Sequence, residues 1–203
     1  MLRRIVKAWQ SSFLLARLRN AEGAEIIEFA ISLPLLMVFV VGIYDFGAAF
    51  ALRQKLNNAV SEGVRTASNQ PMRDLSATGA CGAPGTVCAV RDVVASTLAA
   101  SNVNNCGLIG VTASPPPPNL TWTFASSTGC PAGPLTLKIE RGYTYTTTLS
   151  TPFRTTPYTI EATRITLTYP YRWQFVRVFQ ILAPGANYFS SSLKSVAVMQ
   201  NLN

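Results

Sequence analysis

The sequence has no histidine, and this absence already excludes many kinds of active site. Histidine is the commonest general base in enzymes and the commonest metal ligand in proteins, and none occurs among the 203 residues. The sequence also has no phosphate-binding loop, zinc signature or nucleophile elbow. We therefore expect no enzymatic activity, no cofactor and no metal site.

Charged residues are also scarce. They make up 13% of the chain, against about 25% in an ordinary soluble domain. The net charge of +8 is uneven, because five of the 17 Lys and Arg residues lie in residues 1–23, where Glu22 is the one acidic residue. The rest of the chain has 12 basic and 8 acidic side chains. Such a mildly basic remainder does not predict nucleic-acid binding.

A long apolar segment explains much of the low content of charged residues. Residues 29–44 contain no charged side chain, and the apolar composition continues beyond Asp45 to Leu52. A helix needs about 20 residues to cross the hydrocarbon of a bilayer, so this segment is long enough. Basic residues cluster before it, and the positive-inside rule therefore places the N-terminus in the cytoplasm.

We accordingly predict three parts. Residues 1–23 are a basic cytoplasmic leader, residues 24–52 a transmembrane helix, and residues 53–203 an exported domain. That domain begins with an amphipathic helix over residues 53–68, where apolar side chains recur every three or four positions.

Three residues of the apolar segment need an explanation. Glu28 and Asp45 are carboxylates, which are costly in lipid. A helix rises 1.5 Å per residue, so Asp45 is expected near the far membrane interface. Pro34 removes a helical hydrogen bond, which predicts a bend or local melting.

The start of the segment contains a recognisable spacing. Gly23 ends the basic leader, and counting from Ala24 the fifth and sixth residues are Glu28 and Phe29. This arrangement resembles the site of prepilin peptidase, which cleaves after a glycine followed by glutamate at position five and an aromatic residue at position six. A secretory signal is the main alternative, but its apolar core is only about 7–15 residues and precedes its cleavage site.

The resemblance becomes narrower along residues 23–68. The stretches EFAISLPLL, GIYDFGAAF and LNNAVSEGVRTAS resemble the TadE-like pseudopilins of the tight-adherence (Flp-type) pilus system. This implies a bacterial inner-membrane prepilin that becomes a minor or initiating pilus subunit, supporting surface adhesion or secretion. The implied partners are prepilin peptidase, other pilins and pseudopilins, an inner-membrane assembly platform and membrane lipid.

The resemblance also gives Glu28 a role. Its carboxylate would pair with the free amine that cleavage creates at Ala24, in the same or a neighbouring subunit. Solvation of Glu28 at the membrane interface is the alternative. A signal-anchored extracytoplasmic binding protein or adhesin, outside any pilus, remains the second functional hypothesis.

The fold predicted for the exported part is α+β and pilin-like, with the long N-terminal helix packed on a small antiparallel β-sheet. A second, short amphipathic helix is predicted over residues 90–100. Alternating segments rich in threonine and aromatic residues predict strands, and the turn signals between them include Gly142 and residues 152–157. The strands are expected to begin at Leu120, Leu135, Tyr143 and Tyr158, with a possible last strand around Leu193, Val196 and Val198.

Four cysteines, Cys81, Cys88, Cys106 and Cys130, lie in the part predicted to be exported. An even number in an oxidising compartment predicts two disulfides. Loop length favours the pairs Cys81 with Cys88 and Cys106 with Cys130, while two other connectivities stay open. Neither a zinc site nor a redox motif fits the spacing.

Two further segments have open interpretations. The proline run of residues 114–118 is expected to be an extended connector. The aromatic stretch that follows Tyr171 contains large apolar side chains such as Trp173 and Phe175. It is expected to pack in the core, and an exposed membrane-binding or partner-binding surface is the alternative.

Overall fold

The computed structural model describes most of the chain after the leader. The described residues are 21–76, 78–114, 119–130, 133–151, 154–175 and 190–202. Most of the predicted leader, the proline run 115–118 and the aromatic stretch beyond Phe175 lie outside them. The described residues form two compact units, one with residues 21–46, Gln174 and Phe175, and the other with residues 47–173 and 190–202.

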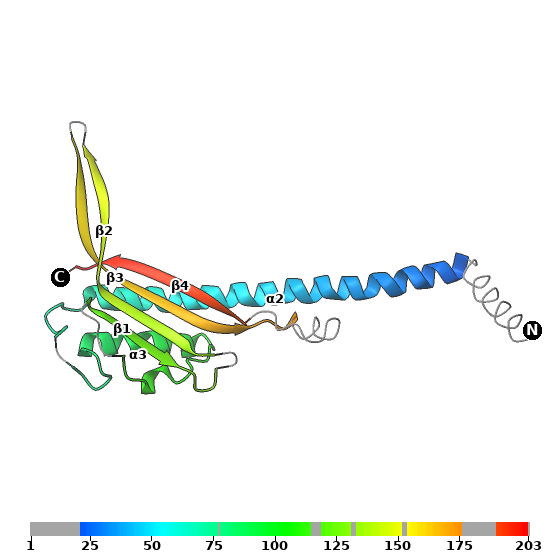
Figure 1. Cartoon of the computed structure of the whole chain (residues 1–203), viewed down its shortest axis with the longest axis horizontal. Helices are drawn as coiled ribbons and strands as arrows, with labels where there is room; N and C mark the ends of the chain where they lie inside the picture. Colours follow the sequence, from blue (N-terminus) through cyan, green and yellow to red (C-terminus); the bar gives the residue numbers. More distant parts are fainter. Residues whose placement is uncertain are drawn as a thin grey trace, which may run out of the picture. The chain divides into compact units, whose positions relative to one another are not determined.

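Helix α2, Ala21–Asn69, is the longest element and contains 49 residues (Figure 1). It continues through Pro34 without interruption, so the expected local melting is not there. A proline inside a helix removes a single hydrogen bond, and the remaining ladder holds the backbone on both sides. The helix ends one residue after Ser68, where Pro71 prevents its continuation.

The sheet is a four-stranded antiparallel meander. Its order is β1-β2-β3-β4, as Figure 1 shows. The strands are β1 Thr121–Ser126, β2 Leu135–Thr151, β3 Arg154–Arg172 and β4 Ser190–Gln200. Helix α3, Gly85–Ala100, begins five residues before its predicted start, and a short 3-10 helix, η1, covers Leu108–Gly110. The predicted α+β class and the antiparallel meander are confirmed.

The predicted turn at Gly142 is wrong. Strand β2 passes straight through it, with a shift of register against β3 between Glu140 and Tyr143. Such an irregularity bends and twists a strand without ending it. Gly142 has no side chain, and the Leu120 side chain occupies the adjacent space, 3.5 Å from where a Cβ would stand. Two predicted strands are therefore one.

The predicted turn over residues 152–157 is also too long. Pro157 lies inside β3 and is paired with Thr148 of β2. Proline is tolerated in a strand where its missing N–H faces an open edge. At this point β3 has no second neighbour in the described register.

The hydrophobic core lies between the C-terminal part of α2, helix α3 and one face of the sheet. Leu56, Val60 and Val64 of α2 are at most 2% exposed. Gly63 marks a close approach, because a Cβ there would stand 2.6 Å from Val94 of α3 and 3.3 Å from Ile165 of β3. The amphipathic part of α2 thus packs as predicted, and glycine allows the close contact.

Arg141 holds the C-terminal end of α2. Its side chain is 1% exposed, and it donates hydrogen bonds to the carbonyl oxygens of Ala67 and, at 2.9 Å, Gln70. The last carbonyls of a helix have no partner within the helix, and a cation is favourable at this end. Burial lowers the pKa of Arg141 below its ordinary value. Strand β2 therefore supplies the cap for the long helix.

We predict that Arg141→Met lowers the free energy of unfolding of the unit that contains the sheet by about 2–4 kcal/mol, because helix-end carbonyls lose their buried donor. Urea unfolding of the full chain in detergent, followed by the fluorescence of the buried Trp122, measures this change. The control is Arg65→Met, since the Arg65 side chain is 64% exposed and its loss should cost at most about 0.5 kcal/mol. Equal stability of the two variants would contradict the capping role.

Candidate processing site and membrane helix

The predicted cleavage residues all lie near the start of α2. Gly23 and Ala24 occupy its third and fourth positions, and Glu28 and Phe29 follow one turn later. Glu28 is exposed, and Phe29 is 66% exposed. The structure gives Glu28 no partner among the described residues.

Helical geometry relates Glu28 to Ala24. Residues four apart lie on the same face of a helix, separated by a rise of about 6 Å. Helical side chains also lean toward the N-terminus, so the Glu28 side chain leans toward the turn that holds Ala24. The five-residue spacing therefore places a carboxylate one turn from the nitrogen atom that cleavage after Gly23 would free.

The following part of α2 is apolar on every side. Its large side chains are exposed; those that are 64–74% exposed include Ile26, Ile31, Leu36, Phe39, Ile43 and Tyr44. A helix that is hydrophobic all round belongs in a membrane or a large core. The helix is long and apolar enough to cross a membrane, and the 20 steps from Ala24 to Tyr44 cover about 30 Å, the thickness of bilayer hydrocarbon. This pattern indicates a membrane anchor.

Asp45 lies at the end of this apolar stretch and is fully buried. Its carboxylate accepts a hydrogen bond of 2.9 Å from the backbone N–H of Phe175, which belongs to the same compact unit. An acidic residue in an apolar segment signals that a partner is needed. Its partner is a backbone group 130 residues away, which no side-chain pattern could reveal.

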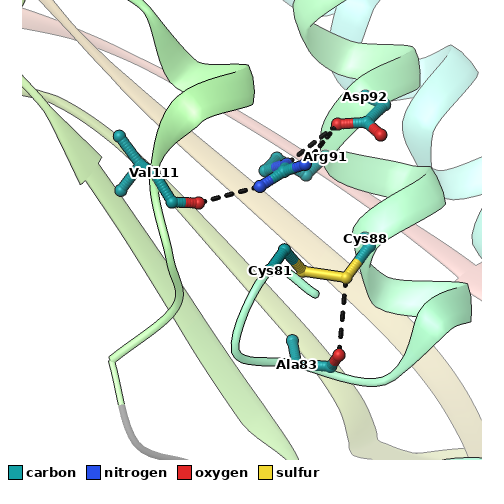
Figure 2. A network of polar contacts seen from close by, with 6 residues as sticks. All are labelled: Cys81, Ala83, Cys88, Arg91, Asp92 and Val111. Carbon is teal, nitrogen blue, oxygen red and sulfur yellow. Dashed lines mark hydrogen bonds and ion pairs between the residues drawn. A yellow bond between two sulfur atoms is a disulfide. The ribbon is translucent and has the colours of Figure 1, made fainter. Parts of the chain in front are cut away.

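Two disulfides hold the loops around α3 and β1. The structure pairs Cys81 with Cys88 and Cys106 with Cys130, with Cα atoms 5.9 and 5.3 Å apart. These are the two pairs that loop length favours. The first bond joins the loop before α3 to the first turns of that helix (Figure 2).

Figure 2 also shows how the same helix is fixed to the segment after η1. The buried Arg91 donates a hydrogen bond of 2.8 Å to the Val111 carbonyl and forms an ion pair of 2.7 Å with Asp92. Cys88 Sγ lies 3.4 Å from the Ala83 oxygen, a van der Waals contact because a disulfide sulfur carries no proton. These contacts are structural, since every group is satisfied within the chain.

The outer face of the sheet carries a charged cluster that the sequence did not single out. Glu140 accepts hydrogen bonds of 2.5 and 2.8 Å from Arg164 and forms an ion pair of 3.0 Å with Lys138. The hydrogen bonds from Arg164 hold the pKa of Glu140 below its ordinary value despite burial. An open hollow of about 670 Å³ lies beside it, lined by β1, β2 and the residues before β1. Strand register alone brings these three charges together.

Comparison with known proteins shows that one region of the chain is similar to a protein family. Residues 23–65 match the profile of a family described as TadE-like protein. This confirms the recognition made from the sequence and indicates a protein associated with the tight-adherence pilus. The matched residues contain the predicted cleavage site, the apolar segment and the beginning of the core-forming part of α2. No curated protein and no solved structure shows significant similarity to the chain.

We predict that Asp45→Ala accelerates hydrogen exchange of the Phe175 amide about ten- to a hundred-fold, because a hydrogen bond to a charged group contributes about 1.5–3 kcal/mol. Hydrogen exchange of the full chain in detergent, resolved by mass spectrometry, measures the rate. Asp45→Asn keeps an acceptor and should show a smaller increase. Glu25→Ala, at an exposed position of the same helix, serves as the control, and unchanged exchange in Asp45→Ala would exclude the contact.

Proposed function

We propose that this chain is a minor pilin of a tight-adherence pilus, made as a membrane-anchored prepilin and cleaved after Gly23 by prepilin peptidase. The single observation that carries the proposal is the TadE-like match over residues 23–65, which begins at the glycine of the predicted cleavage site. The exposed apolar surface of α2 supports this proposal, because a pilin helix must be stable first in lipid and then packed among other helices. The proposed location is a bacterial inner membrane, with the exported unit on its periplasmic side.

Cleavage requires a short stretch of backbone to leave the helix. Gly23 and Ala24 lie within the first turns of α2, and a peptide bond inside a helix is shielded by its own turn. Glycine costs a helix about 1 kcal/mol relative to alanine, and the first four N–H groups have no helical partner. The beginning of α2 is thus the part of the helix that unwinds at the lowest cost.

Cleavage also changes the electrostatics of the helix end. It creates an amine at Ala24, one turn before Glu28, and so supplies a cation where the exposed carboxylate has no described partner. Neutralising Glu28 lowers the cost of keeping it near lipid or in a packed helix bundle. The amine of the same chain or of a neighbouring subunit fills this role, which makes processing a precondition for assembly.

The two carboxylates of the anchor then have separate roles. Asp45 accepts a hydrogen bond from the Phe175 N–H within the chain, so it already has an internal partner. Glu28 is exposed and remains available for contact between subunits. This contrast is the physical reason for placing the assembly contact at Glu28.

The first test is the position of the mature N-terminus. Co-expression with a prepilin peptidase should yield a chain that begins at Ala24, as measured by intact mass and N-terminal sequencing. Gly23→Val should abolish cleavage, because a branched side chain replaces the glycine that the site requires. Gly42→Val, within the same helix and with open space around it, should be cleaved normally. A chain that keeps residues 1–23 beside an active peptidase would instead be a signal-anchored binding protein.

The second test concerns Glu28 after cleavage. Glu28→Gln removes the charge and keeps the shape, so the mature N-terminus should be unchanged while incorporation into sheared pili falls about ten- to a hundred-fold. Immunoblotting of the pilus fraction measures incorporation. Glu25→Gln lies one turn earlier on the same helix and should leave incorporation near the wild-type level. Equal incorporation of both variants would mean that Glu28 is solvated and makes no contact that assembly requires.

A further inference from the structure

The hollow beside Glu140 lies where the regular pairing of the sheet is interrupted. Strand β1 begins at Thr121, opposite Glu140, and β2 continues past this point to Thr151 (Figure 1). The register of β2 against β3 shifts next to Glu140, and Leu120, just before β1, has a positive φ of 49°. Both irregularities border the hollow. Bulges and left-handed residues other than glycine are enriched at functional sites, so we searched this hollow for a binding chemistry.

The lining of the hollow is rich in hydrogen-bonding groups. Its volume of about 670 Å³ falls within the roughly 300–1,000 Å³ of small-ligand sites. Three threonines, Thr121, Thr123 and Thr144, line it together with the half-buried Tyr143. A hydroxyl group can both donate and accept a hydrogen bond. Such a lining suits a ligand that itself carries many hydroxyl groups and small apolar faces between them, as a saccharide does.

The charged side of the hollow is built on a buried carboxylate. Glu140 is 9% exposed. It accepts hydrogen bonds of 2.5 and 2.8 Å from Arg164 and forms an ion pair of 3.0 Å with Lys138. Two cations and one carboxylate leave the cluster with one net positive charge. Glu161, which pairs with Thr144 on β3, is not part of the lining, so a ligand in the hollow meets an excess of positive charge.

Lys138 is the group that can bind an anion in this cluster. Its side chain is 43% exposed, and an ammonium group has three N–H donors, of which the pair with Glu140 occupies one. The Nε and Nη2 edge of Arg164 is already bonded to Glu140, and its guanidinium stacks on the Tyr143 ring, 4.2 Å from the centroid. These contacts order Lys138 and Tyr143 in advance. Less side-chain entropy is therefore lost when a ligand binds.

We propose that the hollow binds a saccharide unit that carries a carboxylate, as a uronic acid does. The carboxylate of the sugar accepts from the Lys138 ammonium, its hydroxyl groups exchange hydrogen bonds with the lining threonines, and the sugar ring packs beside Tyr143. A bare anion such as phosphate would leave the hydroxyl lining unused. A nucleic acid would need a basic patch, and the lining has a single exposed ammonium. The inference goes beyond the proposed function and does not depend on cleavage or on pilus assembly.

The exposure of Lys138 sets the expected strength of binding. Water and salt screen the attraction between exposed charges, so binding of the acidic sugar should be weak and should fall as the salt concentration rises. A neutral sugar of the same shape keeps the hydrogen bonds of the threonines and loses only the contact with the ammonium. Comparison of the two sugars therefore isolates the charged contact.

Saturation-transfer NMR of the full chain in detergent micelles tests the inference. The probe is trigalacturonic acid, and its methyl ester is the matched neutral sugar. We expect the acid to bind about three- to ten-fold more tightly than the ester at low salt, and the difference should shrink when sodium chloride is added. Inorganic phosphate at the same concentration as the acid should not displace it.

Substitutions then locate the site. Lys138→Gln should weaken binding of the acid about three- to ten-fold and leave binding of the ester unchanged, whereas Lys138→Arg should keep most of the affinity. The control is Lys194→Gln, an exposed lysine on the same face of the sheet but outside the hollow, which should change neither. Thr123→Val removes a lining hydroxyl and should weaken both sugars. The fluorescence of the buried Trp122 confirms that each variant is folded.

Four outcomes would overturn the proposal. They are no binding of the acid, equal affinity for acid and ester, displacement of the acid by an equal concentration of phosphate, and equal effects of Lys138→Gln and Lys194→Gln. The last two would indicate a bare anion site and a general effect of surface charge. Because the titration contains neither peptidase nor other pilins, failure here is distinguishable from failure of the proposed function.

Discussion

The packing of α2 against the sheet is the constraint on which the unit of residues 47–173 and 190–202 depends. Leu56, Val60 and Val64 contribute a continuous apolar stripe to the core, and Gly63 allows α3 and β3 to approach the helix backbone. The end of the same helix is capped by Arg141 from β2. Strand β2 thus caps the end of α2 and then continues past the last residue that pairs with β1. A shift in the position of α2 would therefore also displace β2.

The surface of α2 changes character along its length, and its two carboxylates Glu28 and Asp45 lie at the two ends of the apolar part. From Ile26 to Tyr44 its surface is apolar on every side, whereas from Leu56 onward only one face is apolar. Asp45 lies between these two regimes and is satisfied by a backbone N–H, as a buried acceptor must be. Glu28 lies at the other end of the apolar stretch and is exposed. The two carboxylates therefore differ: Asp45 has a partner within the chain, whereas Glu28 has none among the described residues.

The sequence predicted the elements well where one physical pattern had one meaning. The helical period of α2, the alternation of the strands and the position of Pro71 all identified elements correctly. Gly142 was misread because glycine marks a turn and a bulge equally well, and only the register with β3 distinguishes them. The cap by Arg141 and the partner of Asp45 join residues more than 70 positions apart through backbone atoms. No side-chain pattern encodes such contacts, so the structure was needed to find them.

Specific assembly requires more than an apolar helix. A helix that is hydrophobic on every side packs well against many neighbours, because dispersion and burial are not directional, and it therefore fixes neither rotation nor register. The exposed carboxylates of the apolar part of α2, Glu25 and Glu28, both lie near its start, so under the proposed function they could orient a neighbour at one level along the axis. Under the proposed function, the choice and orientation of neighbours would then come from the unit that contains the sheet. In that unit Glu140 pairs with both Arg164 and Lys138, so this cluster keeps one net positive charge on the outer face of the sheet.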